Sequence, residues 1–143
     1  MMRQGIAPVL VVEYDEGVRI VLHDLLTNVG YEVIEHATDA AALDFLAANP
    51  DGVVVVYGNQ DADHHLSAAF FARVVAGKRI ASRHRYLLLS TNPALIPPAL
   101  EAHLIQLNAV VLPKPFDLET VVICVHEAAG RLAPGDAPRR ATG

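Results

Sequence analysis

Short runs of apolar residues alternate along this chain with longer segments in which apolar residues recur every three or four positions. The runs occupy residues 8–12, 53–56, 86–89 and 109–112, while residues 31–35 alternate between apolar and polar side chains. Continuous apolar runs of this length are typical of strands that are buried on both faces of a sheet. The pattern therefore predicts five strands, and the four consecutive valines at 53–56 mark the most clearly buried one.

The segments between the strands have the apolar spacing of amphipathic helices. Asp15, Thr38 and Asp117 each precede such a segment and are residue types that cap a helix N-terminus. Further helices are predicted over residues 66–75 and from Pro97-Pro98 to about Leu107, since proline is tolerated in the first turn of a helix. The faces expected to contact the sheet are Val18, Val21, Leu22, Leu25 and Leu26 in the first helix and Leu118, Val121, Val122, Val125 and Ala128 in the last.

Alternation of five strands with five helices predicts an α/β fold, in which a parallel sheet is covered by helices on both faces. In open sheets of this kind a site forms where the carboxyl ends of the strands meet. The candidate site residues are therefore those that end or follow the predicted strands. They are Glu13, Tyr14, Val56, Tyr57, Ser90, Thr91 and Lys114.

Length and composition narrow the functional classes. The 143 residues suit one domain over residues 7–132, followed by a tail, residues 133–143, that has no apolar periodicity and is expected to be flexible. A net charge of −5 argues against nucleic-acid binding, and a single cysteine, Cys124, excludes a disulfide within the chain. Neither a signal peptide nor a membrane-spanning run is apparent, so we expect a cytoplasmic protein.

The most informative motif is the hexapeptide Leu-Pro-Lys-Pro-Phe-Asp at residues 112–117, where an apolar strand runs into a Lys-Pro peptide. Together with segments 9–19, 49–56 and 87–91, taken in this order and spacing, it resembles the receiver domain of response regulators. The resemblance implies a flavodoxin-like, CheY-like doubly wound sheet, (βα)5, with strand order 2-1-3-4-5. It also implies a cis bond between Lys114 and Pro115.

Receivers hold a magnesium ion through two adjacent acids after the first strand, and this sequence departs from that pattern. Glu13 matches the first acid, which in the family acts largely through water. Tyr14 stands where the second acid should be, and a neutral phenol is a poor ligand for a hard cation. Glu13 is thus a weak magnesium candidate, and we expect no bound metal or other cofactor.

The phosphorylation machinery is also incomplete by this resemblance. The phosphoacceptor aspartate falls on Val56, or on Tyr57 if the register shifts by one residue. The aromatic switch residue, three positions before the lysine, falls on Val111. The terminal hydroxyl of the fourth strand, Ser90, and the phosphate-contacting Lys114 remain. Without the acceptor, Lys114 could pair directly with Glu13 across the strand ends or remain a surface lysine, and a retained contact with a ligand is the alternative.

These departures predict an atypical receiver, a pseudo-receiver of two-component phosphorelay signalling, that is not an enzyme and acts by phosphorylation-independent protein–protein interaction. The expected partner is a histidine kinase, another regulator or a second copy of the chain. In the family, dimers often form through the face made by the fourth helix, fifth strand and fifth helix. Ile105 and Ile123 are expected to be exposed there and are the candidate interface residues.

Two alternatives keep the strand-end pocket functional. Tyr14, Ser90 and Lys114 could bind a small anion or a nucleotide, which would make the protein a ligand sensor. A surrogate acid, Asp61 or Asp63, could accept a phosphoryl group in place of the missing aspartate.

A further alternative is a metal-dependent enzyme that uses the cluster Asp61, Asp63, His64 and His65, because carboxylates and imidazoles are suitable transition-metal ligands. The favoured interpretation of this cluster is a polar, solvent-exposed loop before the third helix. The basic residues Lys78, Arg79, Arg83 and Arg85 are interpreted as a solvated connection, with an anionic partner as the alternative.

Overall fold

The five predicted strands form one parallel sheet in the computed structural model, which describes residues 7–61 and 63–132. The strands are β1 Val9–Val12, β2 Val33–His36, β3 Val54–Gly58, β4 Arg85–Ser90 and β5 Val110–Pro113. Their order is β2-β1-β3-β4-β5, and every neighbouring pair is parallel. The predicted α/β class and strand order are confirmed. The predicted flexible tail, residues 133–143, lies outside the described residues.

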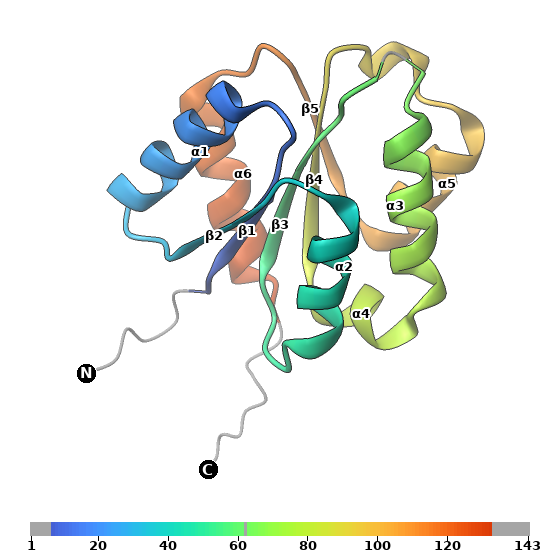
Figure 1. Ribbon diagram of the computed structural model, residues 1–143, viewed down its shortest axis with the longest axis horizontal. Coiled ribbons are helices and arrows are strands. Elements are labelled where there is room, and N and C mark those ends of the chain that lie inside the picture. Colours follow the sequence, from blue (N-terminus) through green and yellow to red (C-terminus); the bar gives the residue numbers. More distant parts are fainter. Residues whose placement is uncertain (1–6, 62, 133–143) are drawn as a thin grey trace.

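Helices cover both faces of this sheet, with α1 and α6 on one face and α2, α3 and α5 on the other (Figure 1). The helices are α1 Glu16–Asn28, α2 Asp39–Ala48, α3 His65–Ala76, α4 Lys78–Arg83, α5 Pro98–Leu107 and α6 Leu118–Gly130, with a 3₁₀ turn, η1, at Pro93–Leu95. No helix in the described part of the chain is both long and apolar enough to cross a membrane.

Alternation along the strands divides the core into two clusters. In β3, Val55 and Tyr57 pack among residues of α2, α3 and α5, whereas Val54 and Val56 pack among residues of α1 and α6. All four side chains are fully buried. This arrangement explains the run of valines, because a central strand that is covered on both faces has no polar side.

The helix starts follow the predicted caps. The carboxylate of Asp15 accepts a hydrogen bond from the Val18 amide at 3.0 Å, and that of Asp117 accepts one from the Thr120 amide at 3.1 Å. Each bond satisfies one of the amides that a first helical turn leaves without an intrahelical partner. The helix predicted to start at Pro97-Pro98 is α5, in which Pro97 is the N-cap and Pro98 the first residue. The Lys114–Pro115 bond is cis, as the resemblance implies.

Two residues predicted to face the sheet do not. Val21 is 44% exposed, because successive helical residues turn by about 100° and Leu22 and Leu26 take the sheet-facing side of α1. Leu118 is 46% exposed, since it lies in the first turn of α6, beyond the end of β5. Both predictions were wrong, because apolar periodicity does not show where a residue lies relative to the buried face of its helix or to the end of the sheet.

The predicted irregular connection between α3 and β4 contains the short helix α4. Gly77 ends α3, and the following six residues, which lack glycine and proline, form one and a half further turns. Ile80 anchors the helix, because its side chain packs against the core and its carbonyl accepts a hydrogen bond from the Tyr86 hydroxyl at 2.8 Å. The basic residues of this segment are thus held on an ordered element.

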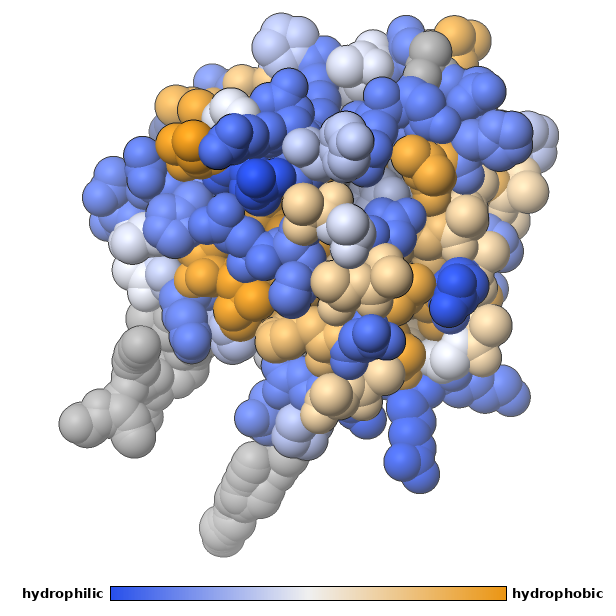
Figure 2. All heavy atoms as spheres, in the orientation of Figure 1, coloured by the Kyte–Doolittle hydropathy of each residue, from blue (hydrophilic) through white to orange (hydrophobic). Residues whose placement is uncertain are grey.

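Apolar residues also remain at the surface. Figure 2 shows that on one side of the molecule they lie in small groups between hydrophilic residues. Ile105 on α5 and Ile123 on α6 are 68% and 51% exposed, as predicted for the candidate interface. Ile20 on α1 is similarly exposed, at 52%, so exposure alone does not single out one face.

Candidate functional site

A hollow of about 530 Å³ lies at the carboxyl ends of β1, β3 and β5. It is bounded by residues from the loop after β1, the loop after β3 and the end of β5, so the predicted site is at the predicted edge of the sheet. The residues that line it are Glu13, Tyr14, Asp15, Glu16, Gly17, Asn59, Gln60, Thr91 and Lys114. Its lining is acidic, with three carboxyl side chains and one ammonium.

Glu13 and Lys114 form an ion pair across the strand ends, which is one of the alternatives that the sequence left open for Lys114. The ammonium Nζ lies 2.9 Å from Oε1 of Glu13, as a close ion pair rather than a well-directed hydrogen bond. Oε2 accepts a hydrogen bond from the Asp15 amide at 3.0 Å. The Glu13 side chain is 1% exposed and that of Lys114 13%, so the charges are largely withdrawn from water and depend on each other.

Gly58 makes room for this carboxylate. β1 and β3 are in register with Val12 opposite Tyr57, which places Gly58 beside Glu13 at the strand ends. A Cβ atom at Gly58 would overlap Oε1 of Glu13. The space above Gly58 is therefore filled by the Glu13 carboxylate, and β3 contributes no side chain there.

The two residues considered for the acceptor position point away from the hollow. Val56 is buried in the core beneath α1 and α6. Tyr57 is buried on the other face, where its hydroxyl donates to both carboxylate oxygens of Asp39, at 2.9 and 3.1 Å. Burial, followed by the nearby Asp39 charge, raises the pKa of Tyr57, so the phenol stays protonated and acts as a donor. Burial also raises the pKa of Asp39.

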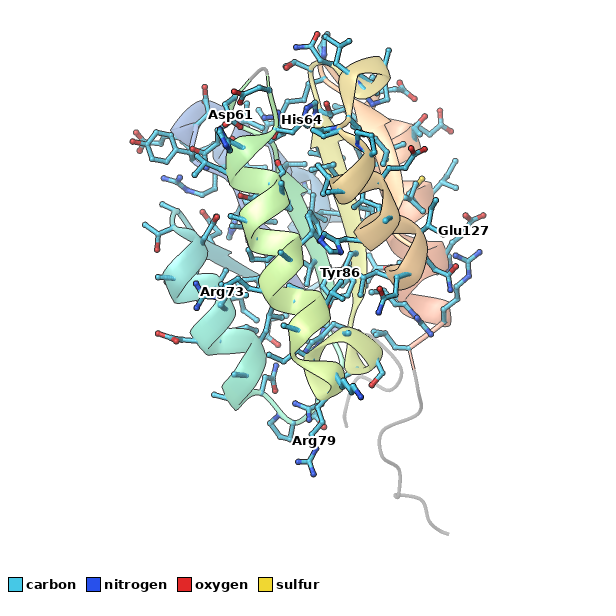
Figure 3. The ribbon with its side chains drawn as sticks, turned by 90° about the vertical axis from the view of Figure 1, so that its right-hand side faces the viewer. Asp61, His64, Arg73, Arg79, Tyr86 and Glu127 are labelled. Atoms are coloured by element: carbon cyan, nitrogen blue, oxygen red, sulfur yellow. The ribbon has the colours of Figure 1, made fainter. Side chains whose placement is uncertain are left out.

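Ser90 is fully buried, and its hydroxyl is already engaged. Oγ lies 2.8 Å from Nε2 of His64 and accepts a hydrogen bond from the Asn92 amide at 3.0 Å. His64 was predicted to lie in an exposed loop, but its side chain is fully buried. A left-handed backbone conformation, φ 60°, turns the residue inward just before α3. Figure 3 shows His64 and Asp61 at this end of the molecule.

Asn59 ties the strand ends together. Its carbonyl accepts a hydrogen bond from Nζ of Lys114 at 3.2 Å, and its amide donates to the Leu89 carbonyl at 2.8 Å. Its side chain donates to the Asp61 carbonyl at 2.6 Å and accepts from the Ser67 hydroxyl. The loop after β3 is thus fastened to β4, β5 and α3 by one residue.

The remaining predicted positions lie around this network. Tyr14 lines the hollow but is 66% exposed, with its phenol at the surface. Val111, the switch position, is half-buried on β5 and lines a different groove beside α5. Ile105 borders that same groove.

The four residues of the candidate metal cluster do not converge. Asp61 Oδ2 accepts hydrogen bonds from the amides of His65 and Leu66 at the start of α3, and His64 is turned into the core. Within residues 7–61 and 63–132, no group of three or more suitable side chains could hold a metal ion. The metal-enzyme alternative therefore loses its site.

Magnesium does not fit the strand-end hollow. Its Glu13 carboxylate is paired with Lys114, and the Asp15 carboxylate caps α1. Tyr14 offers a phenol at the surface and Gly58 offers no side-chain oxygen at all. Magnesium requires near-octahedral coordination by hard oxygens, which these groups do not supply together.

Three contributors to the site were missed from the sequence: Gly58, Asn59 and His64. A glycine at the end of an otherwise valine-rich strand does signal a close approach of another group, so Gly58 could have been found. The contacts of Asn59 with Lys114 and of His64 with Ser90 join residues that are far apart in the chain, and no local pattern marks them.

Among the comparisons with known proteins, the one with solved structures supports the observed fold. No family model matches the sequence, and no curated protein sequence matches it. Among solved structures, the chain is similar to the signal receiver domain of an HD domain-containing protein from Pseudomonas fluorescens Pf-5, with 20% identity, 91% of each chain covered and a TM-score of 0.70.

Two further receiver structures are similar. One is a CheY-like response regulator receiver domain protein from Methanospirillum hungatei JF-1, with 19% identity, 87% of this chain and 94% of that chain covered, and a TM-score of 0.70. The other is the receiver domain of the hybrid histidine kinase CckA, with 20% identity, coverage of 86% and 99%, and a TM-score of 0.64. The chain thus has the fold of CheY-like response-regulator receiver domains.

Proposed function

We propose that this receiver-fold chain is a pseudo-receiver of two-component signalling, which acts by protein–protein interaction without being phosphorylated. One observation carries the proposal: the Glu13 carboxylate lies over Gly58 and pairs with Lys114. In receivers the corresponding lysine contacts an aspartyl phosphate. Here the lysine is committed to a carboxylate of its own chain.

The rest of the switching apparatus supports the same conclusion. The Ser90 hydroxyl is held by His64 and by the Asn92 amide, and Val111 has no ring to swing between two positions. A ligand or modification shifts a conformational equilibrium only as far as it interacts differently with the two states. Lys114 and Ser90 are both engaged in contacts within the chain, so neither is available to respond to a phosphoryl group. Recognition of a partner is the function that the fold retains.

The proposed interaction surface is the face of α5, β5 and α6, where Ile105 and Ile123 are exposed. A histidine kinase, another regulator or a second copy of the chain is the proposed partner. The anion-sensor alternative gains no support from the geometry, because Lys114 is paired, Ser90 is buried and the hollow is acidic. No observation favours catalysis.

The test is phosphorylation with a small donor. The protein is incubated with magnesium and acetyl phosphate, and its intact mass is measured, with a parallel titration of beryllofluoride. We expect no phosphoryl adduct and no saturable beryllofluoride binding. A phosphoryl adduct that is labile as an acyl phosphate would contradict the proposal, and its loss in Asp61→Asn or Asp63→Asn would identify the surrogate acceptor.

A further inference from the structure

Most of the lysine and arginine residues that the structure describes lie at the end of the molecule opposite the acidic hollow. Within residues 7–61 and 63–132, the ion pairs of lysine and arginine with carboxylates involve only Arg19 and Lys114. The other cations lie on α3, α4, the start of β4 and the residue after α6, where the strands begin; Figure 3 shows Arg79 at that end. They are Arg73, Lys78, Arg79, Arg83, Arg85 and Arg131.

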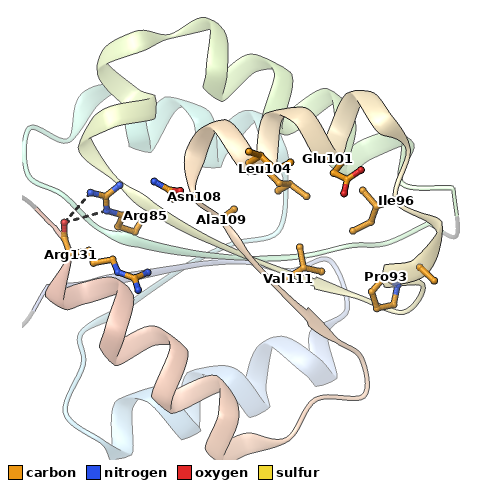
Figure 4. A pocket seen from close by; sticks show the side chains of 11 residues that line it. Arg85, Pro93, Ile96, Glu101, Leu104, Asn108, Ala109, Val111 and Arg131 are labelled. Atoms are coloured by element: carbon orange, nitrogen blue, oxygen red, sulfur yellow. Dashed lines mark hydrogen bonds between the residues drawn. The ribbon is translucent and has the colours of Figure 1, made fainter.

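Two adjoining hollows open among these cations. The larger, about 1060 Å³, is a groove beside α5 and β5, and the smaller, about 450 Å³, lies between α4 and α5. Arg85 and Asn108 line both. Figure 4 shows Arg85, Arg131 and Asn108 gathered at one end of the larger groove and Glu101 towards the other. The groove therefore has a basic end and an acidic end.

At the basic end of the groove, hydrogen bonds within the chain hold the Arg85 guanidinium in place. Nε and Nη2 of Arg85 donate to the Arg131 carbonyl at 3.3 and 3.1 Å, which fixes the guanidinium plane. These bonds leave Nη1 for an external acceptor. Lys78 lines the adjoining hollow, so a third cation, besides Arg85 and Arg131, lies near this end of the groove. A fixed guanidinium loses little freedom on binding and suits a carboxylate better than a mobile ammonium does.

The middle of the groove is apolar and runs along an open sheet edge. Leu104 of α5 and Val111 of β5 line it, with Ile96 further along (Figure 4). β5 is the last strand of the sheet, so among the residues that the structure describes no strand pairs with its outer side. Such an edge can accept an extended segment by main-chain hydrogen bonding, while pockets beside it select the side chains.

We propose that this groove binds an acidic segment of a partner protein, in which a carboxylate contacts Arg85 and Arg131 and the adjoining aliphatic side chains lie against Leu104 and Val111. The inference rests on the proposed interaction function and specifies its partner. Charge complementarity selects a polypeptide with an acid at one end, since Glu101 opposes a uniformly anionic ligand such as nucleic acid.

The test selects the ligand from random sequence. A phage library of random dodecapeptides is panned on the immobilised wild-type protein and counter-selected on an Arg85→Gln, Arg131→Gln double variant. We expect enriched peptides to combine acidic and aliphatic residues. The selected sequence is then synthesised, labelled and titrated by fluorescence anisotropy. Arg85→Gln should weaken its binding about tenfold or more, and added salt should weaken it further.

The matched control is Arg73→Gln, which removes an equally charged residue from the exposed face of α3 and lines neither hollow. It should bind the peptide as the wild type does, and all variants should melt at similar temperatures. Absence of enrichment, enrichment of peptides without acids, or equal binding to wild type and Arg85→Gln would overturn the inference. None of these results bears on the acetyl phosphate experiment, which tests the proposed function separately.

Discussion

At the scale of single residues, the strand-end site depends on Gly58, because a glycine has no side chain. Gly58 is the position where β3 reaches the strand-end hollow, and its lack of a Cβ lets the Glu13 carboxylate lie there and meet Lys114. The strand-end site is thus formed by a glycine on one strand together with the acid and the lysine that the sequence already marked.

We expect Gly58→Ala to destabilise the protein by about 2–3 kcal/mol, because the new methyl group must displace a buried carboxylate or the strand itself. Urea denaturation followed by circular dichroism measures the change. In a Glu13→Ala background the same substitution should cost much less, since the overlapping oxygen is gone. Gly130→Ala is the control: its Cβ meets nothing within 4 Å, so it should be neutral or slightly stabilising. Equal costs of Gly58→Ala with and without Glu13 would show that the overlap is not the cause.

At the scale of elements, a buried histidine joins three of them at the end of the sheet opposite the hollow. Nδ1 of His84 accepts a hydrogen bond from the Val53 amide at 3.0 Å, so Nε2 carries the proton and faces the Leu46 carbonyl at 3.3 Å. The residue therefore links the end of α2, the start of β3 and the start of β4. Burial lowers the pKa of His84 to about 4, because the charged imidazolium would lose its hydration there.

This histidine predicts a loss of stability in mild acid. The folded-state pKa lies below the unfolded value of 6.5, so between those values the unfolded chain binds more protons than the folded one. The contribution is complete above pH 6.5 and is lost as the pH falls towards 4, by up to about 3 kcal/mol. The free energy of unfolding, measured by urea denaturation from pH 7.5 to 4, should show this fall. His84→Gln should be less stable at pH 7 and should show a shallower dependence on pH; an unchanged dependence would mean that other groups cause it.

At the scale of the whole molecule, charge and apolar surface are unevenly distributed. The carboxyl ends of the strands form an acidic hollow, and the opposite end carries cations that have no ion pair within the described part of the chain. The α5–β5–α6 face exposes apolar side chains beside a groove. An exposed apolar surface next to a charged one is characteristic of a site of association. The interaction that we propose therefore belongs to one face of the molecule rather than to the hollow.

If a second copy occupies that face, Ile105→Glu should weaken self-association, because a charge would be buried against an apolar partner. Sedimentation velocity over a range of concentrations measures this effect. Ile20→Glu on α1 is the matched control, since Ile20 is comparably exposed on the other side of the sheet. A wild-type chain that stays monomeric, or equal effects of both substitutions, would contradict self-association through this face and leave a different protein as the partner.

The strands, the main helices and the parallel α/β architecture could all be predicted from the amino-acid sequence. These follow from apolar periodicity, capping residues and the order of strand ends, all of which are local properties of the chain. Tertiary structure alone decided that Gly58 hosts the Glu13 carboxylate, that His64 turns inward to Ser90, and that Arg85 and Arg131 meet at one groove. Each of these depends on side chains from distant segments that meet only after the sheet has formed, and no periodic pattern records such meetings.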